Sequence, residues 1–265
     1  MRLSFIEDTL TRASVIAMSH FGTVTSTVKD GDANQVVTEA DFAVGQEIID
    51  RIQTVFPRDS ILDEETGLHR GTSDYVWVVD PVDGTSNFAA GSPMFGVMLG
   101  LLRESVPVAG GVALPALGEL YLAERDGGTT CNGRTITVTA EEELLSVLVA
   151  YGIDGNREDP EQTYAEVRLL ADIALNCRNI RTTNSAVDQM MVARGTYGAS
   201  LNQSSRIWDN VAPAIIIEEA GGIYTDFHGR PVRFRVQQSS MTDRYTWCTA
   251  APMLHTRLQE LLPES

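Results

Sequence analysis

Cysteine and positive charge are both scarce in this sequence. The three cysteines are odd in number and far apart, at positions 131, 177 and 248, which excludes a disulfide framework and a CxxC metal site. The 20 Lys and Arg residues are outnumbered by 36 Asp and Glu, so the formal net charge is −16. Because non-specific binding to nucleic acid or to an anionic membrane needs a basic face, we expect neither partner.

Long hydrophobic runs and histidines at zinc-binding spacing are also missing. The longest apolar run, residues 95–102, contains glycines and is too short to span a bilayer. The N-terminal segment mixes charged with apolar residues, unlike a signal peptide. The four histidines lie far apart, at positions 20, 69, 228 and 255, so a hydrolytic zinc site is not expected. These absences favour a soluble protein in the reducing cytoplasm.

With 265 residues, 43% of them hydrophobic, the chain can bury a sizeable core. We expect an N-terminal α+β half at residues 1–140 that carries most of the candidate metal ligands. Apolar periodicity predicts its helices at 5–20 and 38–57, separated by a polar loop at 29–35. Hairpins from 95 to 138, with a turn at Asn132-Gly133, predict an antiparallel sheet.

From residue 141 to 265 strands and helices alternate, which predicts a C-terminal α/β half. Its helices are expected at 160–176, 185–194, 208–220 and 252–262. One of its strands is expected at 196–201. Its other strands are expected at 146–151, 179–182, 223–226 and 245–250.

A buried strand at 75–80 ends in a group of oxygen ligands. This strand delivers Asp80 into a site, and Pro81 is expected to stop it. Because Pro81 also fixes φ and turns the chain, Asp83 can return to the same side. The carbonyl oxygen of Val82 can then face inward while its side chain packs outward. Ligation by oxygen alone selects Mg²⁺ or Mn²⁺.

Gly84 and Thr85 follow directly and begin the next helical turn. Their free N–H groups are suited to binding an anion such as phosphate. An acidic protein that acts on an anionic substrate needs a positive electrostatic potential at its binding site, and bound cations would supply it.

Four further acidic residues lie at strand ends or helix starts. Asp41 lies in the first turn of the second helix, Glu64 and Glu65 follow a short strand at 60–62, and Asp209 opens a helix after Trp208. Each has a simpler interpretation when taken alone. Asp41 and Asp209 can be helix caps, and the two glutamates can be surface loop residues.

Four motifs spread over almost the whole chain bring these residues together. They are VTEAD at 37–41, DEET at 63–66, WVVDPVDGTSNF at 77–88, and WD at 208–209 followed by EAGG at 219–222. They resemble, in order and spacing, the V-T-x-x-D, G-E-E-S, D-P-[IVL]-D-G-T-x-N-F and W-D…E-A-G-G motifs of the inositol monophosphatase family, Mg²⁺-dependent and lithium-sensitive phosphatases. Asp63 replaces the glycine of the second motif. The resemblance implies a layered αβαβα sandwich of the sugar-phosphatase type and a homodimer.

The resemblance also implies a metal centre that binds two or three Mg²⁺ ions, with Mn²⁺ as a substitute. Its ligands would be Glu64, Asp80, the Val82 carbonyl, Asp83 and Asp209. Thr85, hydrogen-bonded to Asp41, would orient with Glu64 a metal-activated water for in-line attack on a phosphate monoester. No covalent nucleophile is needed.

Substrate contacts are implied on both sides of this centre. The amides of Gly84 and Thr85 would bind the phosphate, with Ser86 beside them and Asp83 and Asp209 facing the substrate. Asn184, Ser185 and Ala186, at the start of a helix, loosely match a substrate-side Gly-Thr-Ala stretch of the family.

Two further positions bear on the identity of the substrate. Asn202 stands where inositol monophosphatases carry a glutamate, and it can still bond a polyol hydroxyl, without a charge. Arg206 lies near the expected entrance, where it can meet a second phosphate or remain a solvated loop residue.

The leading hypothesis is hydrolysis of inositol 1-phosphate or a similar small phosphorylated polyol or sugar, because Ser86-Asn87-Phe88 resembles the inositol-phosphate branch. The alternative within the same superfamily is a fructose 1,6-bisphosphatase or another bisphosphate phosphatase. From another class, the chain could be a non-catalytic relative that binds metal or a protein partner. The presence of every ligand argues against that last interpretation.

Overall fold

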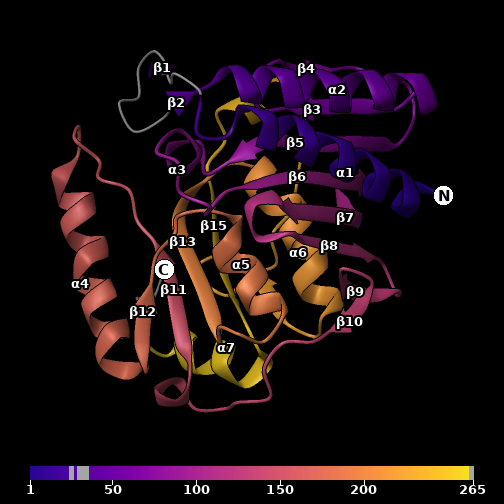
Figure 1. Ribbon diagram of the computed structural model, residues 1–265. Helices are drawn as coiled ribbons and strands as arrows, with labels where there is room; N and C mark the ends of the chain where they lie inside the picture. The colour runs from indigo at the N-terminus through magenta and orange to yellow at the C-terminus, as the bar shows by residue number, and fades with distance from the viewer. Residues whose placement is uncertain (24–26, 29–35, 263–265) are drawn as a thin grey trace.

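The computed structural model describes residues 1–23, 27–28 and 36–262 and arranges them in alternating layers of helices and sheets (Figure 1). The helices are α1 (Arg2–His20), α2 (Glu39–Val55), α3 (Thr85–Ala89), α4 (Pro160–Asn176), α5 (Ala186–Ala193), α6 (Trp208–Glu219) and α7 (Pro252–Gln259). Short 3₁₀ turns lie at Pro115–Leu117, Leu144–Ser146 and Gln238–Met241.

The first large sheet has eight strands in the order β10-β9-β8-β7-β6-β5-β3-β4. Their bounds are β3 (Ser60–Asp63), β4 (Gly67–His69), β5 (Tyr75–Asp83), β6 (Gly96–Arg103), β7 (Val106–Leu114), β8 (Glu119–Glu124), β9 (Gly128–Cys131) and β10 (Arg134–Ile136). All neighbours pair antiparallel except β3 and β5, which pair parallel. A separate two-stranded ribbon joins β1 (Thr27–Val28) to β2 (Val36–Val37).

The second sheet has five strands in the order β12-β11-β13-β15-β14. Their bounds are β11 (Leu148–Gly152), β12 (Asn179–Arg181), β13 (Ala199–Ser205), β14 (Ile223–Thr225) and β15 (Tyr245–Ala250). The sheet is mixed, because β11 pairs parallel with β12 and β13 whereas β15 pairs antiparallel with β13 and β14.

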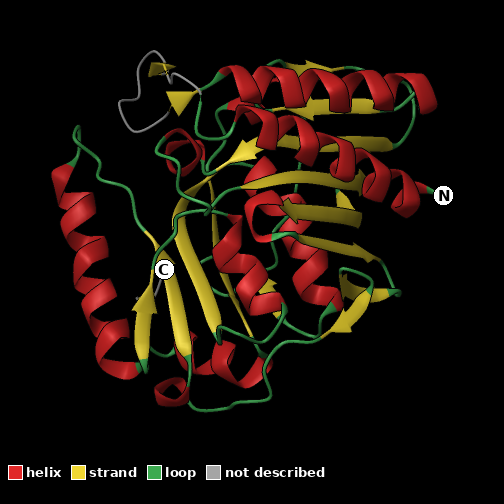
Figure 2. Cartoon of the chain, viewed as in Figure 1, coloured by secondary structure: helices red, strands yellow, loops and turns green. Residues whose placement is uncertain are grey.

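Three hydrophobic clusters join five layers. One lies between α1 and α2 and the first sheet, a second surrounds α5 and α6 between the two sheets, and a third lies between the second sheet and α4 and α7. Figure 2 shows the same succession of red and yellow layers. Helix α6 approaches the first sheet closely at Gly100 and Gly110, where an added Cβ would lie 2.6 Å from Val211 and 2.8 Å from Ile215. The predicted αβαβα sandwich is therefore confirmed.

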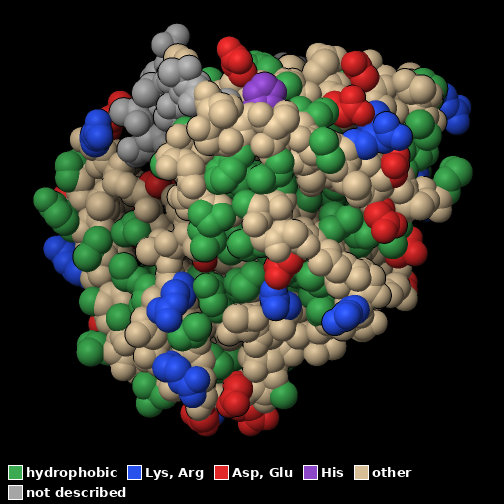
Figure 3. Space-filling model, viewed as in Figure 1, with side chains coloured by type: hydrophobic (Ala, Val, Ile, Leu, Met, Phe, Trp, Pro, Cys, Tyr) green, Lys and Arg blue, Asp and Glu red, His purple; other side chains and the backbone are tan. Residues whose placement is uncertain are grey.

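Many predicted local features are confirmed by the structure. Thr38 caps α2 in a capping box with Asp41, Asp159 caps α4 with Pro160 at its first position, and Asn132 and Gly133 turn between β9 and β10 with positive φ. The polar loop predicted at 29–35 lies outside the described residues. None of the described helices is long and apolar enough to cross a bilayer. On the face drawn in Figure 3, acidic and basic side chains are interspersed.

Two strand predictions were wrong at their ends. β5 does not stop at Pro81 but continues to Asp83, and its register against β6 shifts between Asp80 and Asp83. From Asp80 to Asp83 the chain of β5 advances three residues while β6 advances two, from Met98 to Gly96, so Pro81 lies in a β-bulge. Proline is tolerated there because the N–H group that it lacks is not needed for a regular hydrogen bond between the strands. The strand predicted at 196–201 instead covers Ala199–Ser205.

Candidate metal centre and active site

The bulge at the end of β5 turns two carboxylates into one space. Asp80 and Asp83 lie on either side of it, and each has an oxygen within 4.8 Å of the other's. The Val82 side chain is 1% exposed and belongs to the cluster under α1 and α2, as predicted for a side chain that packs away from the site. The Val82 carbonyl oxygen accepts a hydrogen bond of 2.8 Å from the Thr85 hydroxyl.

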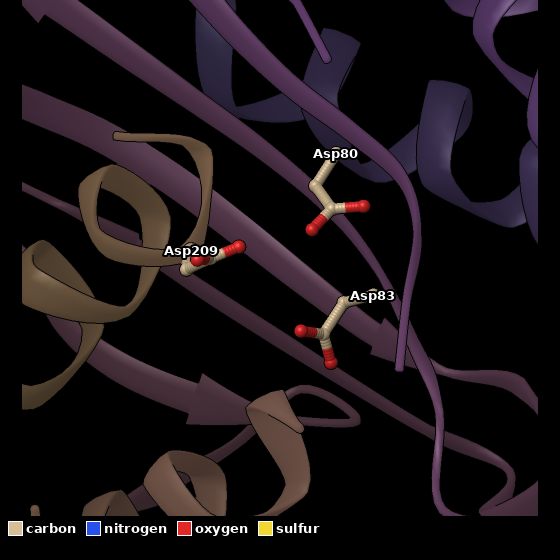
Figure 4. Close-up of side chains that lie close together, drawn as sticks. All are labelled: Asp80, Asp83 and Asp209. Carbon is tan, nitrogen blue, oxygen red and sulfur yellow. The ribbon is translucent and has the colours of Figure 1, made fainter. Parts of the chain in front are cut away.

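Asp209, in the first turn of α6, completes this group. One oxygen of each of Asp80, Asp83 and Asp209 lies within 4.8 Å of the others, and Figure 4 shows the three carboxylates pointing toward a common space. The backbone N–H of Arg206 donates to Asp209 Oδ2 at 2.6 Å, which fixes the orientation of that carboxylate. Two elements that are more than 120 residues apart in the chain thus meet in one acidic centre.

The electrostatics of this centre are unfavourable without a cation. Burial, followed by the charge of Glu64 and then those of the neighbouring aspartates, raises the pKa of Asp80 well above its usual value. Burial and the charge of Asp209 raise the pKa of Asp83 in the same way, and burial raises the pKa of Asp209 to about 6. Oδ1 of Asp80 is buried and has no hydrogen-bond partner within the described residues. This set of oxygen donors fits a divalent cation such as Mg²⁺ or Mn²⁺.

Asp41 and Thr85 lie beside this centre. The buried carboxylate of Asp41 accepts hydrogen bonds through Oδ2 from the Thr38 backbone N–H at 2.8 Å and from the Thr38 hydroxyl at 2.7 Å. Its Oδ1 faces Thr85, whose hydroxyl lies 3.3 Å away. The interpretation of Asp41 as a helix cap therefore holds, and the same side chain also reaches Thr85.

The turn after Asp83 begins the short helix α3. Gly84 adopts a left-handed φ of +74°, and an added Cβ would lie 3.0 Å from both the Met94 carbonyl oxygen and Ser185 Cβ. Ser86 is exposed. Asn87 donates 2.8 Å hydrogen bonds to the carbonyls of Met94 and Thr183, so it joins this turn to the segment that leads into α5.

The N-terminus of α5 adjoins the acidic centre. The Ala186 N–H donates to Asp83 Oδ2 at 2.5 Å, and Ser185 caps the helix by accepting from the Val187 N–H. Ala186 thus holds one of the clustered carboxylates, and Ser185 lies next to the Gly84 turn.

Asn202 is 4% exposed in the middle of β13 and belongs to a polar network. Its Oδ1 accepts from the Ser204 N–H at 2.6 Å, and its amide nitrogen lies 3.4 Å from Asn184 Oδ1. Asn184 in turn donates to Asp154 Oδ1 at 2.8 Å. The Asp154 carboxylate is therefore linked through Asn184 to Asn202, the position at which the inositol monophosphatases that the sequence resembles carry a glutamate.

Arg206 is half-buried and directed at a neighbouring loop. Its Nη1 donates to the carbonyl of Thr242 at 2.7 Å and lies 3.4 Å from that of Asp243. At least one of its donors is thus engaged with backbone.

Comparison with known proteins places these features in a family. The model of the inositol monophosphatase family matches residues 2–264. This chain belongs to the inositol monophosphatase family. It is 33% identical over 233 residues to inositol-1-monophosphatase ImpA of Mycolicibacterium smegmatis, a match that covers 86% of this chain and 80% of that protein. It is 32% identical to a histidinol-phosphatase of Chlorobaculum parvum, with 83% of each chain covered.

The fold agrees with this family. The crystal structure of the extragenic suppressor protein suhB from Bartonella henselae matches with a TM-score of 0.88 at 25% identity, covering 99% of this chain and 98% of that one. As a member of the inositol monophosphatase family, the chain is a phosphatase of this superfamily that acts on small phosphorylated substrates.

Sequence reasoning did not anticipate that two aspartates close to the family motifs are buried. Asp63 and Asp188 are 0% and 2% exposed, and each accepts hydrogen bonds from backbone N–H groups of a turn. Asn184 adopts a left-handed φ of +54°. The Asn184-Ser185 dipeptide before a helix is a turn signal that could have indicated this network. Nothing in the local sequence indicates that Asp63 and Asp188 are buried.

Proposed function

We propose that the chain hydrolyses a small phosphate monoester with the help of Mg²⁺. The observation that carries the proposal is the convergence of Asp80, Asp83 and Asp209, three carboxylates from two distant elements. Burial raises the pKa values of all three, and the charges of neighbouring carboxylates raise those of Asp80 and Asp83 further. Folding alone gains nothing from such a group, because each unpaired charge removed from water is costly.

The proposed metal ligands are Glu64, Asp80, the Val82 carbonyl, Asp83 and Asp209. The segment 1–140 supplies most of them, and 141–265 supplies Asp209 and the substrate side. When bound, Mg²⁺ would lower the pKa of a water molecule and neutralise charge on the phosphate.

Thr85 and Asp41 are proposed to handle the proton of the attacking water. The Thr85 hydroxyl has one proton, and both Asp41 Oδ1 and the Val82 carbonyl lie within its reach. If it donates to Asp41, its lone pairs can accept a hydrogen bond from water. Together with Glu64 it would hold that water in line with the bond to be broken.

The phosphate is proposed to bind at the turn of Gly84 and Thr85, with Ser86 at its exposed edge. Two features support this position: Gly84 keeps the turn open where a Cβ would press on Ser185, and the acidic centre lies directly before it. The negative charge of these carboxylates would repel a phosphate dianion, so the proposal requires the cation.

For the substrate we propose inositol 1-phosphate or a similar polyol monophosphate. The amides of Asn202 and Asn184, backed by the Asp154 carboxylate, present donors and acceptors of the kind that hydroxyl groups need. The similarity to an inositol-1-monophosphatase supports the same substrate class. A bisphosphate is less favoured, because Arg206 already donates to a backbone carbonyl.

The test is phosphate release with Mg²⁺ from four esters: inositol 1-phosphate, fructose 1,6-bisphosphate, adenosine 3′,5′-bisphosphate and histidinol phosphate. The last is included because a relative is named histidinol-phosphatase. Preference for the inositol ester supports the proposal. Preference for a bisphosphate that Arg206→Ala abolishes would replace it by the alternative, and no release together with no Mg²⁺ binding in calorimetry would favour the non-catalytic interpretation. The homodimer and the cytoplasmic location stay predictions.

A further inference from the structure

The turn that carries Glu64, residues 63–66, is closed by a single buried side chain. Asp63 ends β3 and is 0% exposed. Its Oδ1 accepts three hydrogen bonds, from the Glu65 N–H at 3.2 Å, the Thr66 N–H at 2.8 Å and the Thr66 hydroxyl at 2.7 Å. The backbone on the C-terminal side of Glu64 is therefore held by Asp63, while the Glu64 N–H itself donates to the Val79 carbonyl at 3.2 Å.

The other oxygen of Asp63 lies close to Gly45 of α2. Asp63 Oδ2 is buried without a hydrogen-bond partner within the described residues. A Cβ added at Gly45 would lie 3.2 Å from this oxygen and 3.2 Å from Pro81 Cγ. Gly45 is one helical turn after Asp41 on α2, and Pro81 forms the bulge between Asp80 and Asp83. Asp63 Oδ2 and the Pro81 ring of the bulge thus both lie close to Gly45 of α2.

We infer that Asp63 is a positioning residue that sets the place of Glu64 relative to Asp80, Asp83 and Asp41. The inference rests on the proposed function, in which Glu64 is a metal ligand. It is specific to this chain, because the motif that 63–66 resembles carries glycine at this position. A glycine has no side chain that could accept the three hydrogen bonds or reach α2. In this chain the Asp63 side chain therefore closes the turn that carries Glu64.

Burial of Asp63 is costly for folding, because one of its carboxylate oxygens has no hydrogen-bond partner within the described residues. Residues that orient metal ligands characteristically change metal affinity by about 10-fold to 100-fold when they are removed.

The test compares three variants of the 63–66 turn with a matched control. Asp63→Ala removes all three hydrogen bonds, Asp63→Asn keeps an acceptor at Oδ1, and Thr66→Val removes the hydroxyl bond alone. Asp59→Asn is the control, because Asp59 immediately precedes the same strand, has a side chain 5% exposed and accepts from Arg2, Ser73 and Trp77. It lies about 13 Å from Asp63 along β3.

Two readouts are measured on the full chain: the Mg²⁺ dissociation constant by calorimetry, and the Mg²⁺ concentration that gives half-maximal phosphate release. We expect both to rise at least about 10-fold in Asp63→Ala and less than about threefold in Thr66→Val and Asp63→Asn. Asp59→Asn should lower the melting temperature and leave both readouts unchanged. If Asp63→Ala does not fold, Thr66→Val replaces it in the test. A larger rise of the Mg²⁺ dissociation constant in Thr66→Val than in Asp59→Asn then supports the positioning role of Asp63.

Equal Mg²⁺ affinity in Asp63→Ala and wild type would overturn the inference, as would an equal loss in Asp59→Asn. A wild type that binds Mg²⁺ but releases no phosphate from any ester would refute the proposed function alone. In that case the calorimetric comparison of Asp63→Ala with Asp59→Asn still decides the role of Asp63.

Discussion

Replacing Asp80 by asparagine should make the metal-free protein more stable while abolishing its response to Mg²⁺. Asp80 is 2% exposed, and its Oδ1 has no hydrogen-bond partner within the described residues. Asparagine has nearly the same shape, carries no charge and offers N–H donors to the neighbouring carboxylates. The substitution therefore removes repulsion without leaving a cavity.

The size of the effect follows from the separation of the three carboxylates. Their oxygens lie within 4.8 Å of one another. At that separation and an effective dielectric constant of about 20, two unit charges repel by about 3.5 kcal/mol. The protein already relieves part of this by binding protons, as the raised pKa values of Asp80 and Asp83 indicate. We expect a net gain of about 1–3 kcal/mol at pH 8, or about 2–10 °C in melting temperature.

The gain should depend on pH with a definite sign. The pKa of Asp209 is raised to about 6 in the folded protein, above its value in the unfolded chain. The contribution of Asp209 to the stability of the metal-free protein is therefore largest at low pH, where the carboxyl group is protonated. That stability is lost as pH rises from about 4 through about 6. The difference between Asp80→Asn and wild type should therefore be small at pH 5 and largest at pH 8.

The assay is thermal unfolding of both proteins at pH 5, 6.5 and 8, in EDTA and in Mg²⁺. Mg²⁺ at about 100 times its dissociation constant should stabilise wild type by about 2.7 kcal/mol and the variant hardly at all. Asp74→Asn, which changes an exposed carboxylate, is the control and should shift neither curve. An Asp80→Asn protein that is less stable than wild type in EDTA at pH 8, or that keeps the Mg²⁺ shift, would refute the reasoning.

Three further substitutions test the residues around this centre. Thr85→Val removes the hydroxyl that faces Asp41, so kcat should fall by about 100-fold or more at an unchanged KM and recover in Thr85→Ser; a normal kcat would contradict the proton role. Gly84→Ala places a Cβ 3.0 Å from the Met94 carbonyl oxygen at a φ of +74°, so the melting temperature should fall by about 2–8 °C and inhibition by inorganic phosphate should weaken. Asn202→Ala should lower kcat/KM for inositol 1-phosphate by about tenfold with the same Mg²⁺ dependence, whereas an equal loss for every ester would exclude a specificity role.

Short-range features were predictable because they depend on neighbouring residues. The capping box of Thr38 and Asp41 needs only three residues of spacing, and the Asn132-Gly133 turn needs only residues that tolerate positive φ. The Asp80–Thr85 segment likewise indicated that two carboxylates and a carbonyl return to one side of the chain. These inferences required no knowledge of what packs against them.

Pairing between distant strands was not predictable in the same way. The path of β5 through Pro81 depends on β6, whose register accommodates one extra residue. A proline stops a strand only where its missing N–H would be needed, and that is decided by the partner. The parallel pairing of β3 with β5 and the strand β4 also depend on neighbours that local patterns do not identify.

The amino-acid sequence by itself determined which residues are candidate metal ligands, the caps and turns around them, and the order of motifs that marks the family. The tertiary structure alone decided that Asp209 meets Asp80 and Asp83, that Ala186 holds Asp83, and that Asp63 is buried beside α2 at Gly45. The physical reason is the distance along the chain over which each interaction acts. Backbone conformation and helix capping depend on a few neighbouring residues. Burial and the repulsion between carboxylates arise only when distant elements pack into layers and exclude water.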